Sequence, residues 1–166
     1  MNRILVIGCP GSGKSVFSRS LNELTGIPLH HLDMIHWRAD RTFIPREQLI
    51  EELKKIFAAD KWIIDGNYGS TMELRLSYCD TVFFLDYPTE VCYEGIMKRR
   101  GTVRPDMPWI EPADEIDGDF VKTVLQYNSV QRPLVLERLE RFSDREIHIF
   151  KSRTEASTFL ETLKKA

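Results

Sequence analysis

A glycine-rich stretch, GCPGSGKS, occupies residues 8–15 and follows directly on the apolar run ILVI. It fits the pattern G-x-x-x-x-G-K-S/T, in which glycines let successive backbone N–H groups face one concavity and the next helix adds its positive N-terminal end. Lys14 would contact the β- and γ-phosphates of ATP, and the hydroxyl of Ser15 would ligate Mg²⁺. The apolar strand before it and the helix after it are the context that the pattern requires. The expected ATP-binding residues are Gly8, Pro10, Gly11, Ser12, Gly13, Lys14, Ser15 and Val16.

A carboxylate closes the strand-like run KWIID at residues 61–65. In open α/β sheets, ligands bind at the carboxyl ends of the strands, so Asp65 is expected to act in catalysis and to hold Mg²⁺ through its hydration shell. Gly66 would let a substrate approach the backbone closely. The alternative is that Asp65 only starts a turn, which the sequence DGN does readily.

A third cluster, LDMIHW at residues 32–37, follows the second expected strand. Asp33 would accept a proton from an acceptor hydroxyl or help with the metal, and the ring of Trp37 would stack on a substrate. The alternative places Trp37 against the edge of the sheet. His36 is expected to be an ordinary surface residue.

Arginines are frequent, and guanidinium groups suit phosphate oxygens and the charge that develops in phosphoryl transfer. The run KRRGTVRP places Arg99, Arg100 and Arg104 where a helix enters an irregular segment. We expect Arg100 and Arg104 to act in catalysis from a closing lid. Most of the other arginines are expected on solvated helix surfaces: Arg75, Arg132, Arg138 and Arg141.

Three weaker candidates remain. Asp86 is either a second acid at the sheet edge or the end of a strand before a helix that starts with proline. Cys9 lies inside the glycine-rich stretch, where its side chain is expected to pack away from the phosphates. The run KSRTEAS at 151–157 is a loop and helix start on which an adenine base could rest.

The elements that must position these residues alternate between short β-branched or aromatic runs and longer segments with helical spacing, which indicates βαβ units and a parallel sheet. Strands are expected at 3–7, 28–32, 61–65, 81–86 and 146–150. Helices are expected from Gly13 to the TGIP stop at 25–28, then at 45–60, 70–78, 88–100 and 119–141 and after the last strand. A polar loop is expected around LDMIHWRAD. Residues 101–118, which contain several prolines and acidic residues, are expected to be a lid-like excursion.

The 166 residues suit one domain, 1–166, with one sizeable core. A net charge of −2 does not suggest binding to nucleic acid by phosphate neutralisation. Three cysteines without C-x-x-C spacing indicate neither a disulfide framework nor a zinc site. No apolar run has the length of a membrane span, and no signal-peptide pattern precedes the first strand, so we expect a cytoplasmic protein.

The stretches GCPGSGKS, LDMIHW, IIDGNY, RLSYCDTVFFLDYP and KRRGTVRPDMP together resemble the adenylate-kinase-like P-loop proteins of the topology modulation (FlaR-related) family. The resemblance covers residues 3 to about 153. It implies a three-layer P-loop NTPase fold with a five-stranded parallel sheet in the order 2-3-1-4-5 and helices on both faces, as in nucleoside monophosphate kinases. Asp65 and Gly66 match the Asp-Gly pair of those kinases, and Arg99, Arg100 and Arg104 occupy the place of their lid arginines.

One difference from adenylate kinases concerns the acceptor. Those enzymes continue Asp-Gly with Phe-Pro-Arg, whereas this chain continues with NYG and has its next arginine at Arg75. The resemblance therefore does not imply that AMP is the acceptor of this protein.

Two functions follow as hypotheses. The first is a small kinase that moves the γ-phosphoryl of Mg-ATP to a nucleotide, nucleoside or small hydroxylated acceptor. The second is an ATP-dependent regulator that acts through a partner or on DNA. Acids at two or three strand ends together with a lid favour the kinase, and the absence of an N-K-x-D segment argues against a GTPase. The sequence leaves the oligomeric state and the acceptor open.

Overall fold

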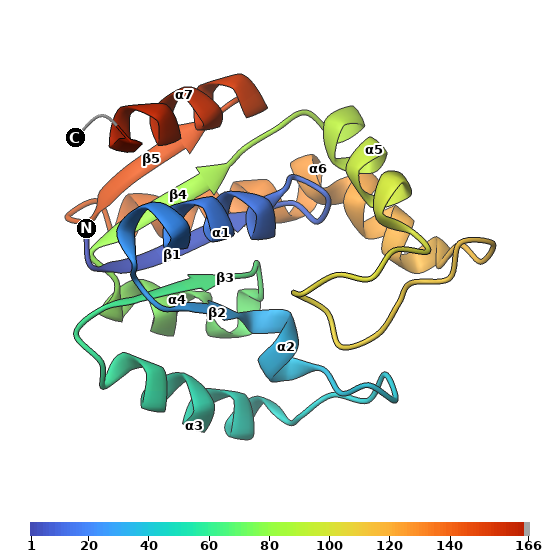
Figure 1. Cartoon of the computed structure of the whole chain (residues 1–166), viewed down its shortest axis with the longest axis horizontal. Helices are drawn as coiled ribbons and strands as arrows, with labels where there is room; N and C mark the ends of the chain where they lie inside the picture. The colour runs from blue at the N-terminus through green and yellow to red at the C-terminus, as the bar shows by residue number, and fades with distance from the viewer. Residues whose placement is uncertain (165–166) are drawn as a thin grey trace.

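Five parallel strands form the centre of the protein, in the spatial order β2-β3-β1-β4-β5 (Figure 1). The computed structural model describes residues 1–164, so the last two residues of the expected domain lie outside the described part. The strand order confirms the fold that the sequence predicted. The strands are β1 (Arg3–Gly8), β2 (Leu29–His31), β3 (Trp62–Asp65), β4 (Thr81–Leu85) and β5 (Glu146–Phe150).

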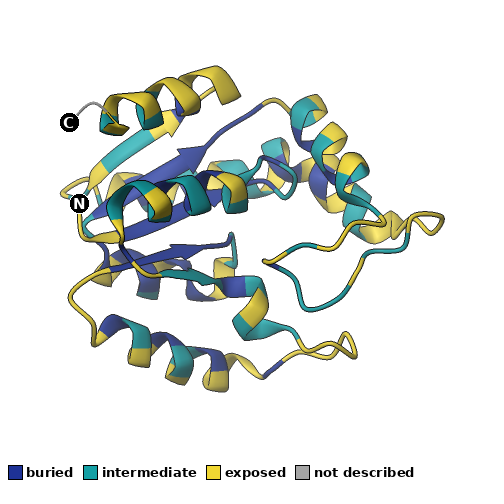
Figure 2. Ribbon diagram, in the orientation of Figure 1, coloured by how far each residue is buried: buried dark blue, intermediate teal, exposed yellow. Residues whose placement is uncertain are grey.

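Helices cover both faces of the sheet. They are α1 (Lys14–Thr25), α2 (Leu32–His36), α3 (Arg46–Phe57), α4 (Gly69–Tyr78), α5 (Thr89–Arg99), α6 (Gly118–Arg141) and α7 (Arg153–Lys164). No helix within residues 1–164 is both long and apolar enough to cross a lipid bilayer. The buried central strands between exposed outer helix faces show the three layers (Figure 2).

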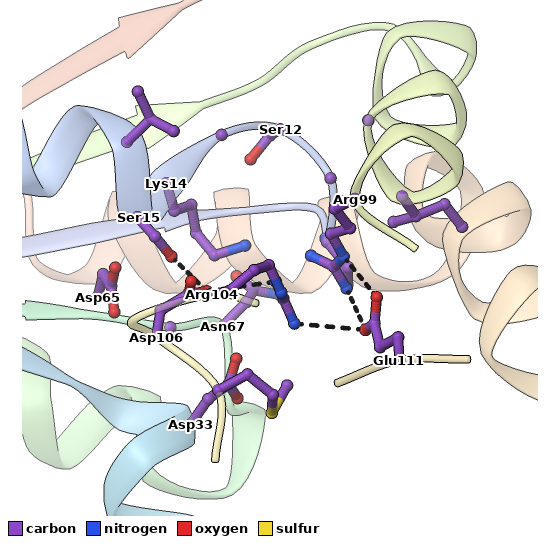
Figure 3. A pocket seen from close by; sticks show the side chains of 18 of the residues that line it. Ser12, Lys14, Ser15, Asp33, Asp65, Asn67, Arg99, Arg104, Asp106 and Glu111 are labelled. Atoms are coloured by element: carbon purple, nitrogen blue, oxygen red, sulfur yellow. Dashed lines mark hydrogen bonds and ion pairs between the residues drawn. The ribbon is translucent and has the colours of Figure 1, made fainter. Parts of the chain in front are cut away.

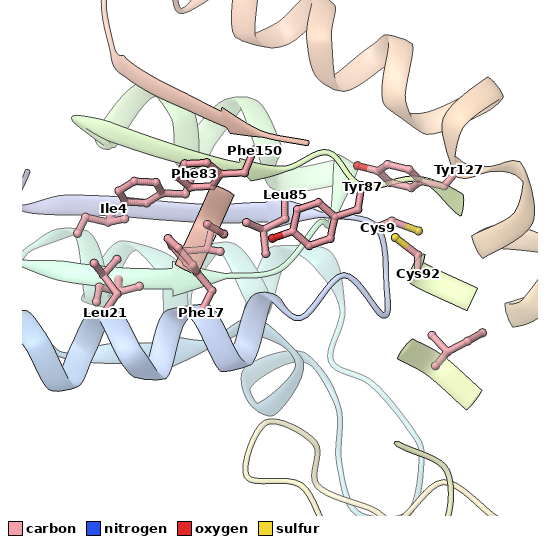
Figure 4. Packing of buried hydrophobic residues seen from close by; sticks show 14 of the residues in the cluster. Ile4, Cys9, Phe17, Leu21, Phe83, Leu85, Tyr87, Cys92, Tyr127 and Phe150 are labelled. Carbon is pink, nitrogen blue, oxygen red and sulfur yellow. The ribbon is translucent and has the colours of Figure 1, made fainter. Parts of the chain in front are cut away.

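Alternation along each inner strand divides the core between the two faces, because successive side chains of a strand point to opposite sides. In β1, Ile4 and Val6 pack with α1, α5 and α7, whereas Leu5 and Ile7 pack with α3 and α4. Figure 4 shows the first of these clusters, in which Phe17 of α1 lies against the strands. Since both faces are covered, β1 is apolar from Ile4 to Ile7, and it ends where the glycine-rich loop begins.

A short helix, α2, replaces the polar loop that the sequence predicted after the second strand. Its buried Leu32 anchors it, and the Trp37 N–H donates to the Asp33 carbonyl (3.0 Å). The ring of His36 stacks on Phe43 with ring centroids 5.2 Å apart. An isolated bridge between Trp37 and Phe43 closes the chain behind it. These contacts stabilise a helix too short to show a clear periodicity.

The segment between α5 and α6 contains neither helix nor strand and folds back toward the carboxyl ends of the strands (Figure 1). It begins at Gly101, whose φ of 70° lies in the left-handed region that favours glycine. The Gly101 N–H donates to the Glu111 carbonyl (2.7 Å), which joins the two ends of a loop within the segment. We call residues 101–118, the last of which is the first residue of α6, the lid segment.

Candidate active site

A large cavity opens at the carboxyl edge of the sheet, with a volume of about 1460 Å³. It is lined by the glycine-rich loop, by residues after β2 and β3, by α5, the lid segment and the start of α7 (Figure 3). Sites for one small molecule usually occupy about 300–1,000 Å³. The cavity therefore has room for two small ligands side by side.

The conformation of the glycine-rich loop depends on its glycines. Gly11 and Gly13 have φ values of 83° and 93°, in the left-handed region. Gly11 also lies against α5, since a Cβ there would approach the Cys92 carbonyl oxygen to 2.0 Å. Conversely, a Cβ on Gly95 would approach the Gly11 oxygen to 2.0 Å. Helix α5 thus supports the back of the loop through direct backbone contact.

Lys14 lies at the mouth of this loop. Its Nζ donates to the carbonyl oxygens of Gly8 and Cys9, both at 3.0 Å. Burial lowers the pKa of Lys14, and the nearby carboxylates of Asp33 and Asp65 act in the opposite direction. The ammonium group is thereby held beside the loop, where a nucleotide phosphate would replace the two carbonyl contacts.

Ser15, the expected metal ligand, has a partner that the sequence did not suggest. Its hydroxyl donates to Oδ2 of Asp106 at 2.9 Å, and Asp106, from the lid segment, is only 6% exposed. Burial acts to raise the pKa of Asp106, but the Arg104 guanidinium and the Ser15 hydroxyl outweigh it and lower that pKa. In the sequence, Asp106 is marked only by its position, two residues after Arg104 and among several acidic residues of the lid segment.

All three lid arginines, Arg99, Arg100 and Arg104, line this cavity, and two of them share a carboxylate partner. Arg99 makes two hydrogen bonds of 3.1 Å to the carboxylate of Glu111. Arg104 reaches both Asp106 (3.3 Å) and Glu111 (3.4 Å), as the dashed lines of Figure 3 show. Arginine and carboxylate side chains alternate here, so the guanidinium groups are held in place beside Lys14 and Ser15.

Arg100 has a different contact. Its Nη2 donates to the Glu115 carbonyl oxygen at 2.6 Å, which ties the end of α5 to the backbone of the lid segment. Among the other predicted nucleotide contacts, Pro10, Gly11, Gly13 and Val16 line the cavity, whereas Gly8 is not one of the lining residues. The Ser12 hydroxyl is buried and has no hydrogen-bond partner among the described residues.

Asp65 lines the cavity, but its nearest partner is a histidine. Its Oδ2 lies 2.9 Å from Nδ1 of His31, and the side chains are 5% and 12% exposed. Burial acts to lower the pKa of His31, and the hydrogen bond to Asp65 outweighs it, so that pKa is raised. No local sequence pattern points to His31, because only the parallel pairing of β2 with β3 brings it beside Asp65.

The donor set suits a magnesium ion that is bound together with a nucleotide. The hydroxyl of Ser15 and the carboxylates of Asp65 and Asp106 are the hard oxygen donors that Mg²⁺ prefers, and the ion usually keeps waters and substrate phosphates as its other ligands. Among residues 1–164, no three His, Cys, Asp or Glu side chains are arranged to hold a metal ion by themselves. Most of the coordination would therefore come from phosphate and water.

Asp33 faces the same cavity from α2. The hydroxyl of Tyr68 donates to its Oδ1 and accepts a hydrogen bond of 2.9 Å from Nε1 of Trp37. Burial raises the pKa of Asp33, although the Tyr68 hydroxyl and the Lys14 charge act to lower it. Trp37 packs edge-on against Trp109 of the lid segment, with centroids 5.1 Å apart. A carboxylate thus lies between aromatic rings on the side of the cavity formed after β2 and β3.

Arg75, the first arginine after the Asp-Gly pair, has a structural position and is fully buried. It donates to the carbonyl oxygens of Gly66 (2.8 Å) and Tyr68 (2.7 Å) and to the Thr71 hydroxyl (3.3 Å). Burial lowers its pKa to about 10. Arg75 therefore fixes the backbone that carries Tyr68 and does not face the cavity.

The second acid at the sheet edge, Asp86, also lies outside the cavity lining. It accepts hydrogen bonds of 2.7 and 2.9 Å from Arg132 and a further one from Lys151. Cys9 packs in the core as predicted, with its sulfur beside that of Cys92 (Figure 4). The hydrogen bond with Cys92 and burial raise the pKa of the Cys9 thiol.

No protein-family model matches the chain, and no curated protein does. Among solved structures, it is similar to shikimate kinase from Bacteroides thetaiotaomicron, with a TM-score of 0.63 and 14% identity over 99% of this chain and 96% of that one. For shikimate kinase from Aquifex aeolicus, the TM-score is 0.56 and the sequence identity is 20%, over 97% of this chain and 93% of that one. For deoxyadenosine kinase from M. mycoides with bound dATP, the TM-score is 0.55 and the sequence identity is 14%, over 98% of this chain and 99% of that one. These similarities show the fold: the chain has the five-stranded parallel α/β fold of these three structures.

Proposed function

We propose that this protein is a small ATP-dependent kinase that transfers the γ-phosphoryl group to a small hydroxylated acceptor. One observation carries the proposal: the glycine-rich loop, the lid arginines and a separate carboxylate converge on a single cavity with room for two ligands. Nucleotide binding alone would need the glycine-rich loop, but it would not need Asp33, which faces the cavity from α2. The kinase names of its structural neighbours, one of them with bound dATP, support the same class.

The residues divide the chemistry between them. The loop N–H groups and Lys14 would hold the β- and γ-phosphates, and Arg99 and Arg104 would balance the charge on the transferred group. A bound Mg²⁺, held by Ser15 and through water by Asp65, would neutralise phosphate charge.

Asp33 would receive the proton of the acceptor hydroxyl. As that proton leaves, the acceptor oxygen forms a bond to the γ-phosphorus, and the bond from phosphorus to the bridging oxygen of ADP breaks. Catalysis in this scheme rests on positioning and charge, without a covalent enzyme intermediate. Asp106 holds the Ser15 hydroxyl in place from the lid segment.

The finer assignments form part of the same proposal. Residues 1–166 form one kinase domain with a lid at residues 101–118. The shared motifs favour a relation to the adenylate-kinase-like topology modulation family. We place the protein in the cytoplasm, because its cysteines Cys9, Cys79 and Cys92 are all free and buried. We propose that it acts on a small molecule without direct contact to DNA.

The test measures ADP release from Mg-ATP with a panel of acceptors: shikimate, deoxyadenosine, other nucleosides, nucleoside monophosphates and small hydroxy acids. One acceptor should raise turnover at least tenfold over the rate without acceptor, and Lys14→Ala should abolish the increase. If ATP binds and no acceptor raises turnover, the kinase proposal is wrong. An ATP-dependent regulator then becomes the better hypothesis, and a screen for DNA and protein partners follows.

A further inference from the structure

Arg19 is a cavity residue that the scheme above does not use. It lies on α1 four residues after Ser15, and residues four apart share one face of a helix. The face that presents Ser15 to the cavity therefore also presents Arg19, which is one of the lining residues. Arg19 is partly buried, unlike the exposed arginines on the outside of the molecule.

The guanidinium of Arg19 has no partner within residues 1–164. Its Nη1 is buried without a hydrogen bond, and no ion pair involves it. Leaving a buried donor without a hydrogen bond is unfavourable, and it is more unfavourable for a charged group. Such a group calls for an explanation, which an unfilled ligand position supplies.

Four carboxylates of the cavity are already engaged with other groups, and no ion pair joins Arg19 to any carboxylate within residues 1–164. Asp65 pairs with His31 and Asp33 accepts from Tyr68. The lid carboxylates pair with other groups: Asp106 with Ser15 and Arg104, and Glu111 with Arg99 and Arg104. An anion that complements Arg19 must then come from a bound molecule.

The position of Arg19 assigns this anion to the acceptor. The positive charge of Arg19 acts on His31, at the end of β2, and opposes the effect of Asp65 on the pKa of that histidine. Helix α1 contacts β2 and β3 as well as β1 and α7, but its Arg19 acts on His31 of β2, on the side where Asp33, Trp37 and Tyr68 line the cavity. The loop that follows β5, where a nucleotide base could rest, lies on the other side of β1 in the sheet order.

We propose that Arg19 binds an anionic group of the acceptor, a carboxylate or a phosphate, while the acceptor hydroxyl faces Asp33. This inference rests on the proposed kinase function, because it names the class of its acceptor: a hydroxylated anion. A guanidinium donates two parallel hydrogen bonds to either a carboxylate or a phosphate. Because Arg19 would hold the anionic group and Asp33 would face the hydroxyl, the acceptor would be bound at two points, and this would orient its hydroxyl for phosphoryl transfer.

The test uses acceptor pairs that differ in charge: shikimate with its methyl ester, and AMP with adenosine. Binding is measured by the fluorescence of Trp37 and Trp109, which line the cavity, with the nucleotide site saturated by Mg²⁺ and a non-hydrolysable ATP analogue. Wild type should bind the anionic member of at least one pair tenfold more tightly than its neutral counterpart. The pair that shows the preference distinguishes a carboxylate from a phosphate.

Arg19→Gln keeps hydrogen-bonding capacity and removes the charge, so it should abolish this preference, and Arg19→Lys should restore part of it. Arg3→Gln is the matched control, since Arg3 is exposed at the amino end of β1. If the preference is absent in wild type or is unchanged in Arg19→Gln, the assignment of Arg19 is wrong. If Arg19→Gln abolishes the preference although no acceptor of the turnover panel raises ADP release from Mg-ATP, the Arg19 site stands and the kinase proposal fails.

Discussion

At the scale of single residues, the hydroxyl of Tyr68 links the aromatic side of the cavity to its acid. It donates to Asp33 and accepts from Trp37, and Arg75 fixes the backbone beneath it. A hydrogen bond to a carboxylate favours the charged form of that carboxylate. Tyr68 therefore opposes the effect of burial, which raises the pKa of Asp33.

Tyr68→Phe should shift the pH dependence of the kinase. With the hydrogen bond removed, the pKa of Asp33 rises further, so the ionised base is lost at a higher pH. The acid limb of kcat/KM against pH should then move to higher pH, and kcat/KM well above that pKa should change less. A pH profile of both enzymes measures this.

Tyr78→Phe is the control, since Tyr78 stacks on Phe57 outside the cavity lining. An acid limb that stays in place or moves to lower pH in Tyr68→Phe would show that Asp33 is not the group that titrates.

The sequence predicted some site residues better than others, and the reason is locality. A contiguous pattern predicted the loop from Gly8 to Val16, because motif and geometry lie within one turn between a strand and a helix. The partnership of Asp106 with Ser15 joins positions 91 residues apart, and that of His31 with Asp65 depends on strand register. Neither pairing has a local signal, and the unpartnered state of Arg19 is visible only when its surroundings are known.

At the scale of elements, α5 holds the glycine-rich loop from behind. Gly95 lies in the middle of that helix, where alanine would normally be more favourable by about 1 kcal/mol. Here the added Cβ would approach the Gly11 oxygen to 2.0 Å, so either the helix or the loop must move.

Gly95→Ala should consequently destabilise the fold by about 1–3 kcal/mol, as overpacked sites do, and weaken ATP binding at least tenfold. Chemical denaturation and nucleotide titration measure the two effects. Gly118→Ala at the start of α6 is the matched control, because a Cβ there meets nothing within 4 Å. Equal ATP affinity in Gly95→Ala and wild type would contradict the role that we give to α5.

The sequence predicted most of the helices and strands. Apolar runs bounded by turn residues predicted all five strands, and their order matches the order implied by the family resemblance. The helix α2 was missed because its five residues are stabilised by Phe43 and Trp37 rather than by an apolar face of its own. Contacts of that kind arise only when the chain is already folded.

At the scale of the whole molecule, the cavity collects residues from both halves of the chain, so a ligand there links elements that are far apart in sequence. A ligand that binds only the folded state adds RT ln(1 + [L]/Kd), or about 2.7 kcal/mol at one hundred times Kd. For a domain of this size each kcal/mol raises Tm by roughly 2–4 °C.

Mg-ATP at that concentration should therefore raise Tm by roughly 5–11 °C, as measured by a thermal melt that follows circular dichroism. Lys14→Ala should lose most of this increase, and the same concentration of inorganic phosphate serves as the ionic control. An equal increase in wild type and Lys14→Ala would place the nucleotide away from the glycine-rich loop.

The contact between Gly11 and Gly95 also limits how this protein can evolve. A Cβ on Gly95 would meet the backbone oxygen of Gly11, 84 residues away, and a Cβ on Gly11 would meet the carbonyl oxygen of Cys92 on the same helix. In both cases the nearest obstacle, at 2.0 Å, is a backbone atom, which no substitution can make smaller. A second substitution therefore cannot rescue the first, as it can where two side chains compete for space. Among descendants of this chain that keep the nucleotide site, we expect both glycines to persist while the surrounding helix surface drifts freely.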